Sequence, residues 1–213
     1  DATNRFHRKF AVFRNRVKAN AEGALAFVDQ ILAALEVAGG AHAHPDDVAP
    51  ARLHGEKRIK GGDPVDLVAL GDAMLMMDEP HLAVMAGKEA AARGIVLPRA
   101  YYALHPIAGR SMDIAPEWAL AIARRESEFD PWVVSPVGAR GLMQLMPRTA
   151  QAMAEAKGVP FREKALLSEP FYNATLGSAY LAKLSREFGN NPMFMAAGYN
   201  AGPSRPARWI EQF

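Results

Sequence analysis

The sequence of 213 residues contains no cysteine, which excludes disulfide bonds and thiolate metal sites. It also lacks any uncharged apolar run near the roughly 20 residues that a membrane-spanning helix requires. Neither charge predominates, since 25 Lys and Arg stand against 23 Asp and Glu, and a net charge of +2 is too small to favour nucleic acid as the main partner. Half of the residues are hydrophobic, so a fold held by packing alone is expected.

Alternation of apolar and polar residues, the mark of a half-buried strand, is missing as well. Apolar residues recur instead at three- and four-residue steps, and several of these stretches begin at a proline, which suits the first position of a helix. The sequence therefore predicts an all-α fold. The expected helices cover about 5–37, 64–75, 80–93, 116–128, 147–157, 170–188, 192–199 and 203–212.

We place a domain boundary near Ser111, where Gly109-Arg110-Ser111 interrupts the chain before the helix expected at Pro116. Residues 1–111 contain pairs of short expected helices, which is typical of a helical-hairpin scaffold. Residues 112–213 form the second predicted domain, and the residue types that could carry chemistry gather there.

Glu126 lies on an apolar stripe of the helix expected at 116–128. Ala119, Ile122 and Phe129 are seven, four and three residues away, so they share its helix face. Apolar surroundings disfavour a charged carboxylate, which moves its pKa from about 4.3 toward the roughly 6–7 that suits a general acid near neutral pH. From the helix alone the preferred interpretation is a structural role, in which Glu126 pairs with a buried Arg.

The segment from Ser135 to Pro147 combines turn-forming Gly and Pro with Ser, Gln and Met, a mixture that core packing does not require. Gly138 and Gly141 permit backbone conformations closed to other residues, and Gln144 offers both a donor and an acceptor for a sugar amide or hydroxyl. On composition alone the segment could equally be a structural connector.

Tyr199 and Asn200 stand at a junction where one expected helix stops and Pro203 starts the next. Both have an ordinary interpretation, because Tyr is often half-buried and Asn often ends a helix. Their interest comes from coinciding with the two signals above.

Taken in order, these residues resemble the soluble lytic transglycosylases of glycoside hydrolase family 23. The resemblance covers the chain from about Asp113 to Phe213, and the segment before it resembles, more weakly, the helical superstructure that these enzymes carry upstream. Its motifs are Glu126-Ser127, Gly141-Leu142-Met143-Gln144 and Tyr199-Asn200-Ala201-Gly202, with Asn173, Gly177 and Tyr180-Leu181 between them.

The resemblance implies a small lysozyme-like helical domain that acts on peptidoglycan between N-acetylmuramic acid and N-acetylglucosamine. Glu126 matches the only catalytic carboxylate of the family. The family continues with further helices beyond the position of Phe213, so the catalytic domain is expected to be truncated there. Positions that line the glycan groove of the family are matched by Ser135, Gln144, Met146, Tyr199 and Asn200.

By the same resemblance we expect no cofactor, and a location in the periplasm or elsewhere in the bacterial envelope. The chain begins at Asp1 rather than Met, so any export signal is expected to have been removed. His42 and His44 near Asp46 and Asp47 carry metal-binding side chains, but a solvated loop is the preferred interpretation and no metal is predicted.

A lone carboxyl group suffices if the sugar assists its own cleavage. Glu126 would protonate the leaving oxygen and then take the proton of the muramic acid C6 hydroxyl, which closes a 1,6-anhydro ring. Two alternatives stay open at this point: a hydrolytic lysozyme of the same fold, and a non-catalytic helical scaffold or glycan-binding module.

Overall fold

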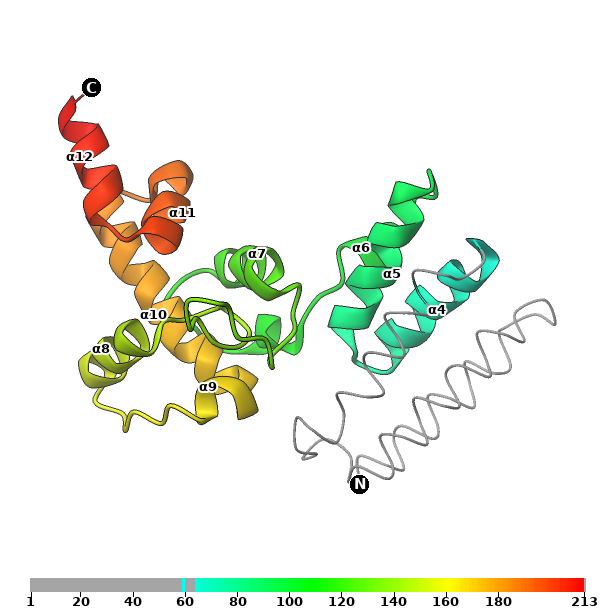
Figure 1. The fold of residues 1–213 in the computed structure, drawn as a ribbon, viewed down its shortest axis with the longest axis horizontal. Helices are drawn as coiled ribbons and strands as arrows, with labels where there is room; N and C mark the ends of the chain where they lie inside the picture. The colour runs from blue at the N-terminus through cyan, green and yellow to red at the C-terminus, as the bar shows by residue number, and fades with distance from the viewer. Residues whose placement is uncertain (1–58, 60–63, 213) are drawn as a thin grey trace. The chain divides into compact units, whose positions relative to one another are not determined.

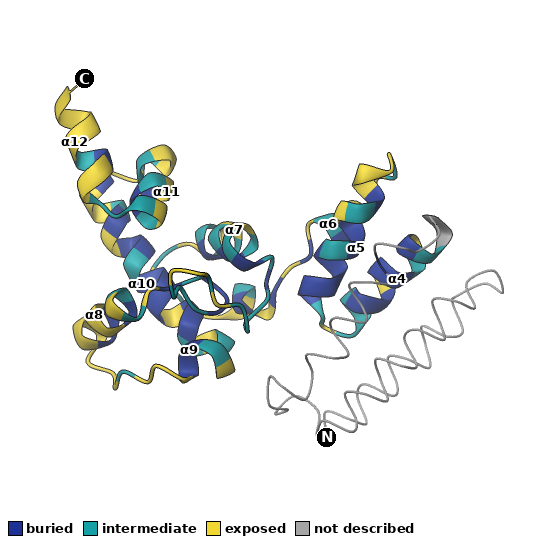
Figure 2. Cartoon of the chain, in the orientation of Figure 1, coloured by how far each residue is buried: buried dark blue, intermediate teal, exposed yellow. Residues whose placement is uncertain are grey.

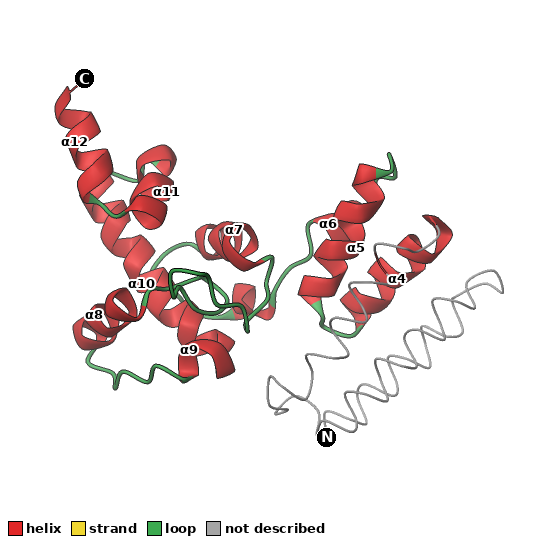
Figure 3. Cartoon of the chain, in the orientation of Figure 1, coloured by secondary structure: helices red, strands yellow, loops and turns green. Residues whose placement is uncertain are grey.

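The computed structural model of the chain describes Ile59 and residues 64–212. The chain divides into two compact units, residues 1–105 and 106–213, and each is described by itself. Within the described residues Figure 3 shows helices joined by loops and no strand, and the β pairings are isolated bridges. The all-α prediction is confirmed. The predicted boundary near Ser111 stays a prediction.

The described part of the first unit contains α4 (Pro64–Met76), α5 (Pro80–Ala92) and α6 (Pro98–Tyr101). Helices α4 and α5 pack against each other, and α6 packs against both. Glycines allow the close approach of α6, because a Cβ at Gly87 would lie 2.4 Å from the Tyr101 nitrogen and one at Gly71 would lie 2.9 Å from the Ala100 Cβ. The remaining contact is apolar, with Leu67 among the fully buried side chains.

The second unit is organised around one long helix, α10 (Pro170–Phe188), which contacts α7, α8, α9 and α11 and lies among them in Figure 1. Figure 2 shows buried residues along much of α10 and a mostly exposed α12. The other elements are η3 (Pro106–Gly109), α7 (Pro116–Ser127), α8 (Pro147–Lys157), α9 (Ala165–Ser168), α11 (Pro192–Ala201) and α12 (Ser204–Gln212).

Local chemistry sets the ends of these helices. Proline occupies the first position of α7, α8, α10 and α11, where its missing N–H leaves no bond unmade. The Asn191 side chain accepts hydrogen bonds from the Met193 and Phe194 N–H groups and so caps α11. Helices α8 and α10 end on Gly158 and Gly189, both in the left-handed conformation that glycine adopts without strain.

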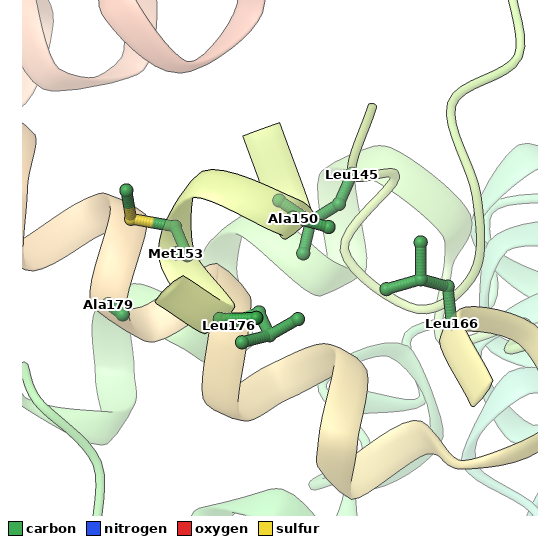
Figure 4. Close-up of a cluster of buried hydrophobic side chains, with 7 residues drawn as sticks. Leu145, Ala150, Met153, Leu166, Leu176 and Ala179 are labelled. Carbon is green, nitrogen blue, oxygen red and sulfur yellow. The ribbon is translucent and has the colours of Figure 1, made fainter. Parts of the chain in front are cut away.

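A buried apolar cluster joins the end of the loop before α8 to helices α8, α9 and α10. Burying one leucine of this kind stabilises the fold by about 1.5–3 kcal/mol. The cluster therefore fixes where the loop that precedes α8 runs. The cluster consists of Ala154 and the residues labelled in Figure 4, which are Leu145, Ala150, Met153, Leu166, Leu176 and Ala179.

A second cluster lies farther along α10. Leu184 and Phe188 of α10 pack there with Met195 of α11, and Tyr199 is half-buried against both clusters. Among the residues that the structure describes, no helix is long and apolar enough to cross a membrane.

Candidate active site

Glu126 lies in the last turn of α7 and is half-buried. Ala119, Ala123 and Phe129 around it on the chain are buried. Burial raises the pKa of the Glu126 carboxyl above its usual range, and the positive charge of Arg125 opposes part of that shift. The direction predicted from the apolar stripe is confirmed.

The alternative role for Glu126, pairing with a buried arginine, finds no support in the ion pairs of residues 64–212, since none of them includes this carboxylate. The positive charge that lowers its pKa is that of Arg125, the next residue along the chain. A half-buried carboxyl group without a fixed cation is easier to protonate than a paired one. Glu126 is therefore chemically suited to hold and release a proton.

Directly after α7 the chain passes through two consecutive non-glycine residues with positive φ. Glu128 has φ of 52° and Phe129 has φ of 68°. Such conformations cost about 1–3 kcal/mol each outside glycine, and they persist where surrounding contacts fix them. Phe129 is only 2% exposed, so its buried ring holds this turn in place.

Ser135 organises a tight turn in the loop between α7 and α8. Its Oγ accepts a hydrogen bond from the Ala139 N–H at 2.9 Å, and its own N–H donates to the Ala139 carbonyl at 2.9 Å. The loop then folds on itself through isolated bridges from Arg140 to Val134 and to Leu145. Ser135 is half-buried in this turn, and its hydroxyl hydrogen is not used in the bond to Ala139.

Gln144 closes the same loop with φ of 46°. Its side-chain Nε2 donates to the Val133 and Gly141 carbonyls, both at 2.9 Å. The amide nitrogen has two hydrogens, so both are committed to the backbone. The sequence interpretation gave Gln144 a donor and an acceptor for a ligand, whereas in the structure the donor is used inside the loop.

Three helices hold the backbone of Leu142 and Met143 with polar side chains. From α7, the Ser127 Oγ donates to the Leu142 carbonyl at 2.6 Å. From α10, the Asn173 Oδ1 accepts from the Met143 N–H at 2.9 Å. From α11, the Tyr199 hydroxyl donates to the Met143 carbonyl at 2.7 Å. Directed hydrogen bonds to backbone atoms therefore fix the loop, in addition to the packing of its side chains.

Asn173 is fully buried, and its Nδ2 also donates to the Arg140 and Leu166 carbonyls, each at 2.9 Å. Gly141 makes room for that amide. It has φ of 73°, and a Cβ there would lie 2.0 Å from the Leu166 oxygen and 2.6 Å from the Asn173 Nδ2. Ser127 and Asn173 belong to the sequence motifs, but the sequence predicted no role for either of them. The available signal was a polar residue on an otherwise apolar helix face.

Tyr199 lies close enough to Glu126 to feel its charge. Burial raises the pKa of the Tyr199 hydroxyl well above its usual range, and repulsion from the charge of Glu126, and from Tyr180 once that phenol ionises, raises it further. The Tyr180 and Tyr199 rings are 5.4 Å apart between centroids. The structure therefore brings together two predicted site residues that are far apart in the sequence.

The remaining predicted site residues are exposed. Met146 directly precedes α8 and is 43% exposed, and Asn200 is exposed near the end of α11. Within the described part of the chain, no group of three or more His, Cys, Asp or Glu could hold a metal ion. The segment from His42 to Asp47 lies outside the described residues.

The family model described as "Transglycosylase SLT domain" matches residues 106–213, about half of the chain. The chain belongs to this family. The resemblance to soluble lytic transglycosylases is thereby confirmed, and the matched range coincides with the second structural unit of this SLT-family chain.

Two curated relatives are soluble lytic murein transglycosylases. The one from Salmonella typhimurium is 45% identical over 114 residues, and the one from Escherichia coli is 41% identical over 114 residues. Each alignment covers 53% of this chain and 18% of the relative. The SLT-family chain thus spans less than a fifth of the length of these two proteins.

Solved structures of this family share the fold. The 70 kDa soluble lytic transglycosylase of Escherichia coli matches with a TM-score of 0.67 and 31% identity, over 76% of this chain and 27% of that one. An inactive glutamate-to-glutamine mutant of the lytic transglycosylase Slt from Pseudomonas aeruginosa matches with a TM-score of 0.70 and 26% identity, over 97% of this chain and 31% of that one. A further structure is a complex of the 70 kDa enzyme with bulgecin A.

Proposed function

We propose that the SLT unit of this chain is a peptidoglycan lytic transglycosylase that cleaves the β-1,4 bond between N-acetylmuramic acid and N-acetylglucosamine. The observation that carries the proposal is the half-buried Glu126, whose pKa is raised by burial and whose charge raises the pKa of the buried Tyr199 hydroxyl. Support also comes from the relatives, which are named soluble lytic murein transglycosylases.

Glu126 acts first as the acid. Its carboxyl proton passes to the glycosidic oxygen, the bond from that oxygen to C1 of the muramic acid breaks, and the N-acetyl group of the sugar stabilises the developing positive charge. The C6 hydroxyl of the same sugar then attacks C1 and gives its proton to the Glu126 carboxylate. A 1,6-anhydro ring closes without water, and the intramolecular nucleophile gains from its high effective concentration.

Glycan contacts are assigned to Ser135, Gln144, Met146, Tyr199 and Asn200. Ser135 and Gln144 belong to one hydrogen-bonded loop, and the Gln144 amide oxygen remains for a sugar N–H or O–H. Met146 is exposed directly after that loop, where a thioether can pack on the apolar face of a sugar ring. A protein with this substrate works in the periplasm or elsewhere in the bacterial envelope.

Mass spectrometry of the products from purified cell walls tests the proposal. The expected product carries a 1,6-anhydro end and is lighter by one water than the product of a lysozyme. A reducing end would identify a hydrolytic enzyme instead. Absence of any released fragment would identify a glycan-binding module or scaffold.

Glu126→Gln tests the assigned acid, because glutamine keeps the shape and loses the proton. We expect turnover to fall by about 10²–10⁴-fold, the usual contribution of general acid–base catalysis, with glycan binding retained. Glu117→Gln is the matched control, since Glu117 is an exposed carboxylate on the first turn of the same helix. Near-normal turnover of the Glu126 variant would remove this residue from the mechanism.

A further inference from the structure

One face of α10 is shaped around the side chain and backbone of Met143. Asn173 and Gly177 are four residues apart and share a helix face. Asn173 accepts a hydrogen bond from the Met143 N–H at 2.9 Å. At Gly177 a Cβ would lie 2.4 Å from the Met143 Sδ and 2.9 Å from its Cε, so the methionine side chain occupies the space that glycine leaves.

The side chain, the N–H and the carbonyl of Met143 are therefore each fixed by a contact. It is fully buried, its side chain is seated on Gly177, and its N–H is bound by Asn173. Its carbonyl oxygen accepts the hydroxyl of Tyr199 at 2.7 Å. Tyr180, the next residue on the same face of α10, packs its ring on that of Tyr199.

The bond to Met143 decides what the Tyr199 hydroxyl can offer to other groups. A phenol carries a single hydrogen, and here that hydrogen goes to the Met143 carbonyl. The oxygen of Tyr199 is then left only as an acceptor for other groups of the site.

We propose that Met143 is a positioning residue, which fixes the Tyr199 hydroxyl in the reaction proposed above. The α10 face sets the place of the Met143 carbonyl, and this carbonyl takes the phenol hydrogen, so that Tyr199 presents an acceptor oxygen to the site. Met143 itself need not touch the glycan, because it is fully buried.

Gly177→Ala, Tyr199→Phe and the double variant test this in the full chain. The methyl group added at position 177 must displace the Met143 side chain from its place on α10, although alanine is the better helix former. We expect kcat on purified cell walls to fall by about tenfold with KM little changed, the effect of one lost hydrogen bond in the reacting state. Gly109→Ala is the matched control, since nothing lies within 4 Å of a Cβ there.

The double variant decides the route of the effect. If Gly177→Ala acts through the Tyr199 hydroxyl, it should slow Tyr199→Phe no further. Effects that multiply, or an unchanged kcat in Gly177→Ala, overturn the positioning role. A wild-type chain that yields no anhydro product defeats the proposed function itself, and this is seen before any substitution is made.

An NMR measurement covers the case in which Gly177→Ala does not fold. Met143-Gln144 is the only Met-Gln pair in the sequence, so labelling Met carbonyl carbon and Gln nitrogen gives a single cross-peak. Tyr199→Phe should shift the carbonyl resonance of Met143 upfield, because the carbonyl loses its hydrogen bond. An unshifted resonance would show that the bond on which the proposal depends is not made.

Discussion

The α4–α5 hairpin and the segment 140–144 hold their positions by different means. The hairpin closes on buried apolar side chains such as Leu67 and on glycines that admit α6. The segment 140–144 is tied by Asn173 and two further polar side chains directly to backbone atoms. Apolar packing tolerates substitutions that keep volume, whereas directed hydrogen bonds specify where each backbone atom lies. Such precision is expected where chemistry is done.

Gly141→Ala should have the largest effect on this comparison. The new Cβ would overlap the Leu166 carbonyl at 2.0 Å with φ of 73°, and backbone cannot move aside as a side-chain end can. We expect a loss of at least about 3 kcal/mol in the free energy of unfolding, measured in urea. Gly138→Ala, with φ of 91° and open space, should cost only the conformational part, about 1–2 kcal/mol. Equal losses would show that the contact with Leu166 is unimportant.

Asn173→Leu and Leu67→Ala should separate stability from activity. The first leaves the buried Met143 N–H and the Leu166 carbonyl without their partner, at about 1–3 kcal/mol for each unsatisfied group, whereas the Arg140 carbonyl keeps its bond from the Leu145 N–H. The second creates a cavity worth about 2–5 kcal/mol. At a temperature where both variants are folded, only Asn173→Leu should lose turnover on cell walls. If Leu67→Ala lost as much, the distinction between the two regions would fail.

Glu126→Gln should stabilise the fold while it lowers turnover. The pKa of Glu126 is higher in the folded chain than in the unfolded chain, so the unfolded state gives up its proton first as pH rises. The wild type therefore loses stability as pH rises from the unfolded pKa, about 4.3, through the folded pKa. Thermal unfolding at pH 7 should show a higher midpoint for the variant, and the difference should vanish at lower pH. A lower midpoint at pH 7 would contradict the desolvation of this carboxyl.

Asp113→Asn should have the smallest effect. The Asp113 carboxylate accepts from the Lys157 ammonium at 2.6 Å, but both side chains are partly exposed. Exposed ion pairs contribute about 0–1 kcal/mol, so urea unfolding should shift by less than that. A larger shift would mean that a surface charge pair rivals the buried amide of Asn173.

Helix positions were predictable because their signals are local. Prolines at 116, 147, 170 and 192 begin helices as expected, and the short segments 106–109 and 165–168 were not predicted because four residues carry too little periodicity. The last helix begins at Ser204, one residue after the expected proline.

The candidate site was only partly predictable. The raised pKa of Glu126 follows from neighbours on its own helix. The partner of Tyr199 is 56 residues away and that of Asn173 is 30 residues away, so these contacts depend on how helices pack. The positive φ of Glu128 has no sequence signature either, since most such positions are glycine.

The side chain of Gln144 offers a hydrogen-bond acceptor, and no donor, to a ligand that binds at this loop. Both of its N–H hydrogens face inward to the Val133 and Gly141 carbonyls, which leaves an oxygen as the outward end of the amide. A ligand can hydrogen-bond to that oxygen only with a donor group. An acetamido N–H or a hydroxyl can donate, and an ether or ester oxygen cannot. Removing the acetyl groups from the glycan would replace a neutral amide donor by an ammonium group. The group that faces the side chain of Gln144 would then be charged.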